Sequence, residues 1–194
     1  ADATVQALSG GETLADSFTA VSADGSTKVV NITITGADDA PSFGGDDLGA
    51  VSEDGTLSDT GALTISDTDQ GEDQFNTQTG SASTSGYGTV DLDASGNWTY
   101  TLDNANATVQ ALSAGETLAD SFSYRIDDLA GDASNAVTVN LTITPANDAP
   151  DIGSNTLIIN SGETVVMTAA ALSASDADDA AAGLTFNVTG LAGG

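Results

Sequence analysis

A near-perfect internal duplication constrains the fold of this chain more than any other feature of its sequence. Residues 3–18 read ATVQALSGGETLADSF and residues 107–122 read ATVQALSAGETLADSF, so that only Gly10 and Ala114 differ. Such identity indicates that the chain contains two copies of one structural unit. A period of about 100 residues is too long for a solenoid repeat and is typical of a whole β-sandwich domain.

A second echo sets the frame of the repeat. The DDAP of residues 38–41 returns as NDAP at residues 147–150, and this separation is five positions longer than that of the first echo. A short insertion must therefore lie between the two echoes, in the loop that follows the duplicated stretch. Dividing the chain after each Ala-Pro predicts three parts: the C-terminal part of a module (1–41), a complete module (42–150) and the N-terminal part of another (151–194).

Short strands dominate the predicted secondary structure. Six segments alternate apolar and polar residues with period two or are rich in strand-forming residues. They are Val29–Thr35, Ala62–Ser66, Gly88–Asp93, Asn97–Leu102, Ser121–Ile126 and Val137–Thr144. Residues 94–96 (ASG) predict a hairpin turn, and residues 107–113 predict at most one turn of helix. The pattern favours an all-β fold of antiparallel sandwich modules in tandem.

The strand pattern also predicts the core. The aromatic side chains alternate along two strands, and packing is a better expectation for them than a sugar-stacking surface. The predicted core comprises Trp98, Tyr100, Leu112, Leu118, Phe122, Tyr124, Ile126, Val139, Leu141 and Ile143. Gly115 is expected at a corner turn, and Glu72 and Asp73 are expected on a solvated loop face.

The charge of the chain excludes several classes of partner. Twenty-nine acids against two bases give a net charge of −27, which repels nucleic acid and anionic membranes. The sequence contains no long apolar stretch, so we do not expect direct insertion into a membrane. Few aromatic residues and high charge are also compatible with disorder, but the patterned apolar residues favour folded modules that need divalent cations or high salt.

Acidic residues recur at fixed distances from the two Ala-Pro linkers. Asp67 and Asp69 follow Asp39 at the same distances at which Asp176 and Asp178 follow Asp148. A glutamate also follows each linker aspartate at nearly equal distances, Glu53 after Asp39 and Glu163 after Asp148. An acid-rich composition yields single matches by chance, but a repeated Asp-x-Asp pair is better explained by a shared role. Oxygen ligands without histidine or cysteine point to calcium.

The central part of the chain resembles a known bacterial repeat. The residues that carry the likeness are YGT at 87–89, GNWTYTL at 96–102, and Leu112 followed by GETL at 115–118. They resemble the VCBS-type, cadherin-like repeats of large RTX-like surface adhesins of bacteria. The resemblance covers 1–41 and 42–150, and residues 151–194 look like the start of a related cadherin-like module. It implies an immunoglobulin-like or cadherin-like Greek-key sandwich.

The resemblance also implies calcium sites shared between adjoining modules. The implied ligands at Pro150 are Glu53, Glu116, Asn147, Asp148, Asp176 and Asp178. Those at Pro41 are Glu12, Asp38, Asp39, Asp67 and Asp69, with Asp127 or Asp128 as further candidates. Leu112 to Glu116 resembles the cadherin Leu-Asp-Arg-Glu motif, but the glutamate lies one position further from the leucine than in that motif. This departure could remove one ligand.

The residues predict a structural role rather than catalysis. The chain has no histidine or cysteine, which excludes Ser-His-Asp and Cys-His nucleophilic catalysis, and we expect it not to be an enzyme. The predicted function is a calcium-rigidified extender of a secreted or cell-surface bacterial adhesin that supports adhesion or biofilm formation. The alternatives are a module that binds carbohydrate or protein ligands and a subunit of a self-assembling extracellular fibre.

The expected partners are other modules. Adjacent modules of the same chain are expected to share calcium, and the two terminal parts are expected to be completed by neighbouring copies through strand exchange. Half a sandwich otherwise has an exposed edge and an incomplete core.

Overall fold

The computed structural model describes residues 2–125, 136–179, 184–187 and 189 as an extended all-β molecule with two single helical turns. In chain order the elements are α1 (Ala3–Gln6), β1 (Thr13–Val21), β2 (Thr27–Thr35), β3 (Ser42–Gly45), β4 (Leu48–Ser52), β5 (Ser58–Ser66), β6 (Gln78–Ala82), β7 (Gly88–Leu92), β8 (Asn97–Leu102), α2 (Ala107–Gln110), β9 (Leu118–Tyr124), β10 (Val137–Thr144), β11 (Asp151–Ser154) and β12 (Ser173–Ser175).

A β-sandwich occupies the middle of the molecule. One sheet has the order β3-β5-β8-β7-β6, and all its pairings are antiparallel. The other has the order β4-β10-β9, in which β9 and β10 are antiparallel. β4 runs parallel to β10, with Leu48 opposite Asn140 and Ser52 opposite Thr144. This parallel edge is a departure from the purely antiparallel sandwich that the sequence predicts, and it brings the end of β4 beside the end of β10.

The alternating residues of β8 show why the sheets pack. Trp98, Tyr100 and Leu102 are buried on one face of the strand, and the residues between them point away from the core. Residues 93–97 form the predicted hairpin turn, in which Gly96 has a φ of 88° that favours glycine. The Trp98 ring meets the Phe122 ring of the opposite sheet edge-to-face at 5.8 Å.

The predicted core is confirmed for the described residues. Leu118 is partly buried against the core, and the other predicted members are buried, except for Ile126, which lies outside the described residues. α2 is the single helical turn that was predicted. Asn106 is its N-cap, and Val109 is its buried residue. Gly115 has a φ of 92°, as expected for a turn that requires glycine.

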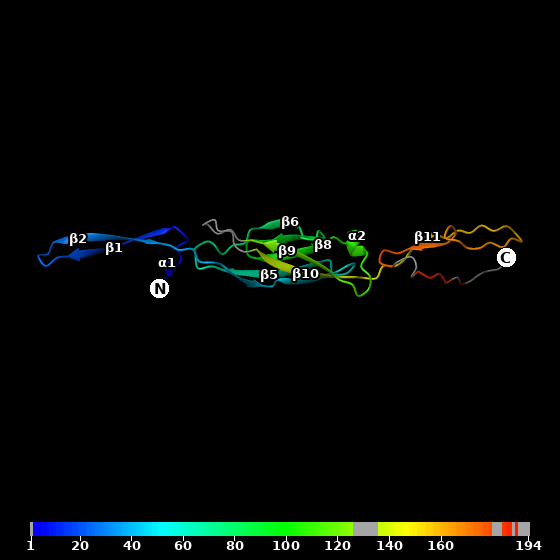
Figure 1. The fold of residues 1–194 in the computed structure, drawn as a ribbon, viewed down its shortest axis with the longest axis horizontal. Helices are drawn as coiled ribbons and strands as arrows, with labels where there is room; N and C mark the ends of the chain where they lie inside the picture. Colours follow the sequence, from blue (N-terminus) through cyan, green and yellow to red (C-terminus); the bar gives the residue numbers. More distant parts are fainter. Residues whose placement is uncertain (1, 126–135, 180–183, 188, 190–194) are drawn as a thin grey trace.

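Figure 1 shows three parts in a row, with the β1/β2 hairpin extending from one end of the sandwich and β11 lying beyond the other. The hairpin repeats the second half of the sandwich, because α1, β1 and β2 correspond to α2, β9 and β10. β11 and β12 repeat its beginning, since Asp151 pairs with Ser175 as Ser42 pairs with Ser66. The buried core of the described residues lies between Val51 and Ile143.

Candidate metal centres at the two joints

Acidic side chains gather where the sandwich meets each neighbouring part. At the Pro41 joint (Asp38, Asp39, Asp67, Asp69 and Glu72), the backbone N–H of Asp39 donates to Oδ2 of Asp69 at 2.8 Å. The N–H of Asp69 in turn donates to Oδ1 of Asp67 at 2.8 Å. Carboxylate oxygens of Asp38, Asp69 and Glu72 lie within 4.8 Å of one another. The linker and the Asp-x-Asp loop that follows β5 are therefore in direct contact.

The Pro150 joint (Glu53, Asp148, Asp176, Asp178 and Asp179) repeats this geometry. The N–H of Asp148 donates to Oδ2 of Asp178 at 3.4 Å, and the N–H of Asp178 donates to Oδ1 of Asp176 at 3.3 Å. Carboxylate oxygens of Asp176, Asp178 and Asp179 lie within 4.8 Å of one another. The repeated spacing of the linker aspartate and the Asp-x-Asp pair thus corresponds to the same local structure at both joints.

A buried glutamate completes the Pro150 joint. Glu53 follows β4 and is 1% exposed. Its Oε1 accepts a hydrogen bond from Nε2 of Gln110 on α2 at 2.7 Å, and its Oε2 accepts one from the N–H of Ala146 at 3.3 Å. The parallel pairing of β4 with β10 places this carboxylate beside the linker that leaves β10.

The loop after each helical turn also reaches its joint. At the Pro150 joint, Oγ of Ser113 donates to the carbonyl oxygen of Asp178 at 2.8 Å. At the Pro41 joint, the N–H of Gln70 donates to the carbonyl oxygen of Ala7 at 3.3 Å. Each loop therefore links the second half of one sandwich to the first strands of the next part.

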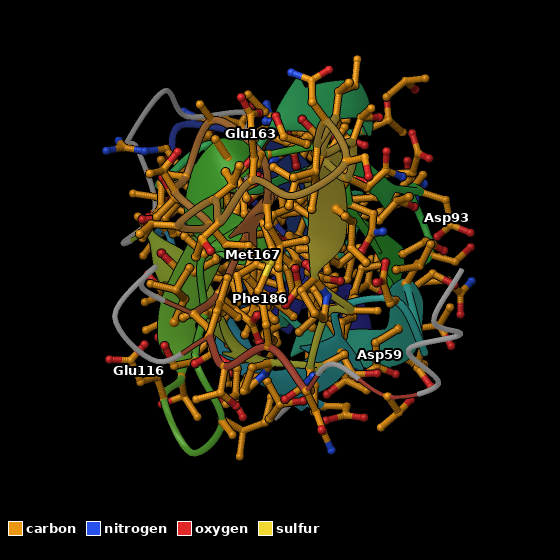
Figure 2. The ribbon with its side chains drawn as sticks, turned by 90° about the vertical axis from the view of Figure 1, so that its right-hand side faces the viewer. Asp59, Asp93, Glu116, Glu163, Met167 and Phe186 are labelled. Carbon is orange, nitrogen blue, oxygen red and sulfur yellow. The ribbon has the colours of Figure 1, made fainter. Side chains whose placement is uncertain are left out.

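The two glutamates of the duplicated stretch lie outside the acid groups. Oε2 of Glu12 accepts from the N–H of Ser9, and Oε2 of Glu116 accepts from the N–H of Ser113. Both side chains are exposed, and Figure 2 shows Glu116 at the periphery of the view along the molecule. The structure assigns them to closing a local turn.

The other predicted site residues have varied positions. Asn147 is exposed, and its Nδ2 donates to the carbonyl oxygen of Asp148. Glu163 is exposed and accepts from Nδ2 of Asn160, away from both acid groups. Asp127 and Asp128 lie outside the described residues.

One expectation is wrong. Glu72 was expected on a solvated loop face with Asp73, yet Glu72 is 2% exposed and belongs to the Pro41 acid group, whereas Asp73 is exposed. The residue has no acidic counterpart at the other joint, where position 181 is alanine, so the repeat could not reveal it. Asp179 was also missed, since its counterpart in the first copy is Gln70.

The acids of the Pro150 joint perturb one another. Burial raises the pKa of Glu53, with a further contribution from the charges of Asp148, Asp54 and Asp178. The pKa of Asp148 is raised by burial and by its contact with the Asp54 carboxyl. The close approach of the Asp176 and Asp178 carboxyls raises the pKa of Asp178 and lowers that of Asp176. Negative charge is therefore crowded at this joint, and a bound cation would relieve the repulsion.

Both joints fit a hard divalent cation. Oδ2 of Asp67, Oδ1 of Asp69 and Oδ1 of Asp178 are buried oxygens without a hydrogen-bond partner. Buried carboxylate oxygens are costly unless they are paired or coordinate a metal. Calcium takes six to eight oxygen ligands from carboxylates, carbonyls and water, and this donor set consists of oxygens alone.

The comparison with protein families agrees with the cadherin-like sandwich. A family model for the bacterial cadherin-like domain matches residues 38–145, which is more than half of the chain. The chain belongs to the bacterial cadherin-like domain family. The cadherin-like match begins at Asp38 in the Pro41 joint and ends at Pro145, immediately after β10. The family is not an enzyme family.

No curated protein sequence matches the chain. One solved structure, a Ca2+-stabilized adhesin that helps an Antarctic bacterium reach out and bind ice, is 15% identical, with a TM-score of 0.25 over 72% of this chain. The chain spans 34% of that structure, and so loose a likeness supports no functional argument. None of the helices in the described part of the chain has the length and hydropathy to cross a membrane.

Proposed function

We propose that this chain is part of a calcium-rigidified extender in a bacterial adhesin on the cell surface or outside the cell. The observation that carries the proposal is the pair of equivalent buried carboxylates, Asp69 and Asp178. Each accepts a hydrogen bond from a linker N–H through one oxygen and has a second oxygen buried without a partner. Each is 9% exposed or less.

The two joints supply different ligands for the cation. Asp38, Asp67, Asp69 and Glu72 would hold it at the Pro41 joint, and Glu53, Asp148, Asp176, Asp178 and Asp179 at the Pro150 joint. A bound calcium ion would neutralise the crowded charge and connect the linker to the parts on either side of it. Without it, carboxylates on both sides of the linker repel one another, which favours bending or separation.

An extender is favoured over a ligand-binding module by the duplication. Near-identical copies of one structural unit suit a spacer, because its length grows with each added unit, whereas a binding site needs distinctive loops. The hydrogen bonds from the linker N–H groups to Asp69 and Asp178 support the same proposal, because the two joints then have the same local geometry. We propose that VCBS-type modules in tandem share calcium at each linker.

The test is calcium titration of the full chain by calorimetry, together with thermal unfolding in calcium and in EDTA. Extracellular calcium sites have dissociation constants of about 10⁻⁴–10⁻³ M, so millimolar calcium is expected to raise the melting temperature. At about 100 times the dissociation constant, one site adds about 2.7 kcal/mol. Asp69→Asn and Asp178→Asn are each expected to remove binding at one joint.

Glu163→Gln is the matched control, because it also removes one negative charge but lies away from both acid groups. It is expected to leave calcium binding unchanged. Absence of binding heat together with identical melting curves in calcium and EDTA would overturn the proposal. Equal losses of calcium binding in Glu163→Gln and in both aspartate variants would instead indicate a general charge effect. That result would also contradict the proposal.

A further inference from the structure

The loop of residues 67–72, which follows β5, supplies three of the acids at the Pro41 joint. Asp67, Asp69 and Glu72 all belong to it. Asp69 is 3% exposed and Glu72 is 2% exposed, so two of the three carboxylates are buried. Oδ2 of Asp67 and Oδ1 of Asp69 are buried without a hydrogen-bond partner. Two buried oxygens from one short segment are therefore available to a cation.

The backbone gives this loop its shape. The N–H of Asp69 donates to Oδ1 of Asp67 at 2.8 Å. Gly71 has a φ of 91°, a conformation that favours glycine, and it turns the chain just before Glu72. Carboxylate oxygens of Asp69 and Glu72 lie within 4.8 Å of each other. The loop thus brings its carboxylates together before a cation binds, which lowers the cost of ordering them on binding.

The corresponding loop at the Pro150 joint is more open. Asp178 is 9% exposed, and Asp179 is exposed. The N–H of Asp178 donates to Oδ1 of Asp176 at 3.3 Å, compared with 2.8 Å between Asp69 and Asp67. Among the described carboxylate oxygens of this second loop, Oδ1 of Asp178 is the one that is buried without a partner. Its acids are therefore less enclosed than those of the 67–72 loop.

The buried glutamate of the Pro150 joint lies on the other side of the linker. The position that corresponds to Glu72 is 181, which is alanine. The joint instead has Glu53, which follows β4 in the sandwich. Its Oε1 and Oε2 already accept hydrogen bonds from the side chain of Gln110 and from a backbone N–H. A cation at this joint must therefore collect its carboxylates from both sides of the linker.

We propose that the 67–72 loop chelates calcium with Asp67, Asp69 and Glu72 and binds it more tightly than the Pro150 joint does, an inference that rests on the proposed function. Calcium affinity depends on the number of charged ligands and on the rigidity of the site. Burial strengthens the attraction of the loop carboxylates for the ion. As calcium falls, the Pro150 joint loses its ion first and bends, while the Pro41 joint keeps its ion.

Calorimetric titration of two variants of the full chain measures the two affinities separately. Asp178→Asn leaves the Pro41 site, and Asp69→Asn leaves the Pro150 site. The calcium dissociation constant in Asp178→Asn is expected to be at least about 10-fold lower than in Asp69→Asn. Equal constants, or tighter binding in Asp69→Asn, would overturn the inference and leave the calcium proposal intact. Absence of binding in both variants and in the wild type would contradict the proposed function and the inference with it.

Glu72→Gln and Asp38→Asn distinguish an ion held by the loop from an ion held by the linker. Each removes one negative charge from the same group of carboxylates. In the Asp178→Asn background, Glu72→Gln is expected to raise the dissociation constant at least about 10-fold, and Asp38→Asn is expected to raise it less. Asp73→Asn changes an exposed acid next to Glu72 and is the control, expected to leave the constant unchanged. A larger effect of Asp38→Asn than of Glu72→Gln would overturn the inference.

Amide hydrogen exchange of the wild-type chain is a second measurement that needs no variant to fold. Exchange of residues 67–72 and 176–179 is followed by mass spectrometry at stepped concentrations of free calcium. Residues 67–72 are expected to become protected at a lower calcium concentration than residues 176–179, because local opening is suppressed where the ion binds first. Protection of both segments at one calcium concentration, or of residues 176–179 first, would overturn the inference.

Discussion

Asp120 shows how the sandwich accommodates an acid in its interior. Its Oδ2 accepts from the hydroxyls of Ser83 and Tyr100, and its Oδ1 accepts from the N–H groups of Ser85 and Ser121. Burial alone raises the pKa of Asp120, but these hydrogen bonds outweigh burial and hold its pKa below the ordinary 3.8. Burial, together with the hydrogen bond to Asp120, raises the pKa of Tyr100.

We expect Asp120→Asn to lower the free energy of unfolding by about 1–3 kcal/mol at neutral pH, because buried donors lose a charged acceptor. A lowered pKa stabilises the fold above the unfolded pKa, and the contribution is lost as pH falls through the folded pKa. The difference between wild type and variant should therefore shrink below about pH 4. Urea titrations at several pH values measure it, with Asp16→Asn as the exposed control. A loss that does not change with pH would contradict this account.

Gly61 is required by close packing against an indole ring. A Cβ atom at this position would lie 2.5 Å from Cε2 and Cζ2 of Trp98. The ring cannot move away freely, because its Nε1 donates to the carbonyl oxygen of Asp46 at 2.8 Å and it is packed against Phe122.

Gly61→Ala is therefore expected to destabilise the sandwich by about 1–3 kcal/mol through overpacking. Trp98 is the single tryptophan of the chain, so its fluorescence reports chemical denaturation of this site directly. Thr60→Ala, at an exposed position of the same strand, is expected to change the midpoint little. Equal midpoints for Gly61→Ala and wild type would show that the ring can shift without cost.

Among the elements, β10 and β2 differ in packing rather than in pattern. Both alternate apolar and polar residues and pair with a neighbouring antiparallel strand, yet β10 is buried on one face and β2 is largely exposed. The local sequence determines that β2 and β10 are both strands. The contribution of each strand to stability depends on whether another sheet packs against it.

Leu141→Ala in β10 is expected to cost about 2–5 kcal/mol, as is usual for a large-to-small change in a core. The matched change Ile32→Ala in β2 is expected to cost less than about 0.5 kcal/mol. Denaturant unfolding monitored by Trp98 fluorescence tests both. A comparable loss for the two variants would show that the hairpin face is covered in solution.

The strands that the sequence predicted best are those with strict alternation. β8 and β10 begin and end at the predicted residues, and β7 ends one residue earlier than predicted. β1, β3, β4, β6, β11 and β12 were not predicted, because glycine, serine and alanine within them weaken the alternation. The parallel pairing of β4 with β10 joins residues as distant in the sequence as Leu48 and Asn140, and no local pattern carries such a pairing.

At the scale of the whole molecule, the parts lie in a row (Figure 1) and acids gather where they meet. With a net charge of −27, repulsion acts along the whole molecule, and each joint brings several acids together. The geometry of the joints therefore determines whether the parts hold a fixed direction relative to one another.

Removing calcium is expected to make the molecule more flexible at both joints. Small-angle X-ray scattering in millimolar calcium should fit one extended shape, and scattering in EDTA should require an ensemble of bent shapes. Asp178→Asn is expected to produce bending at the Pro150 joint even in calcium, while Glu163→Gln should scatter like wild type. A single extended shape in both solutions would show that hydrogen bonds alone hold the joints.

The sequence by itself determined the repeat, its frame, the all-β class, most of the aromatic and aliphatic core, and the correspondence of the two Asp-x-Asp loops. These follow from local patterns and from equal spacing in related copies. Tertiary structure decided which acids meet. It buried Glu72 and Glu53, left Glu12, Glu116 and Glu163 exposed, and placed Asp179 in the Pro150 group. The physical reason is that exposure and proximity depend on which strands face one another, and β4 meets β10 only in the folded sandwich.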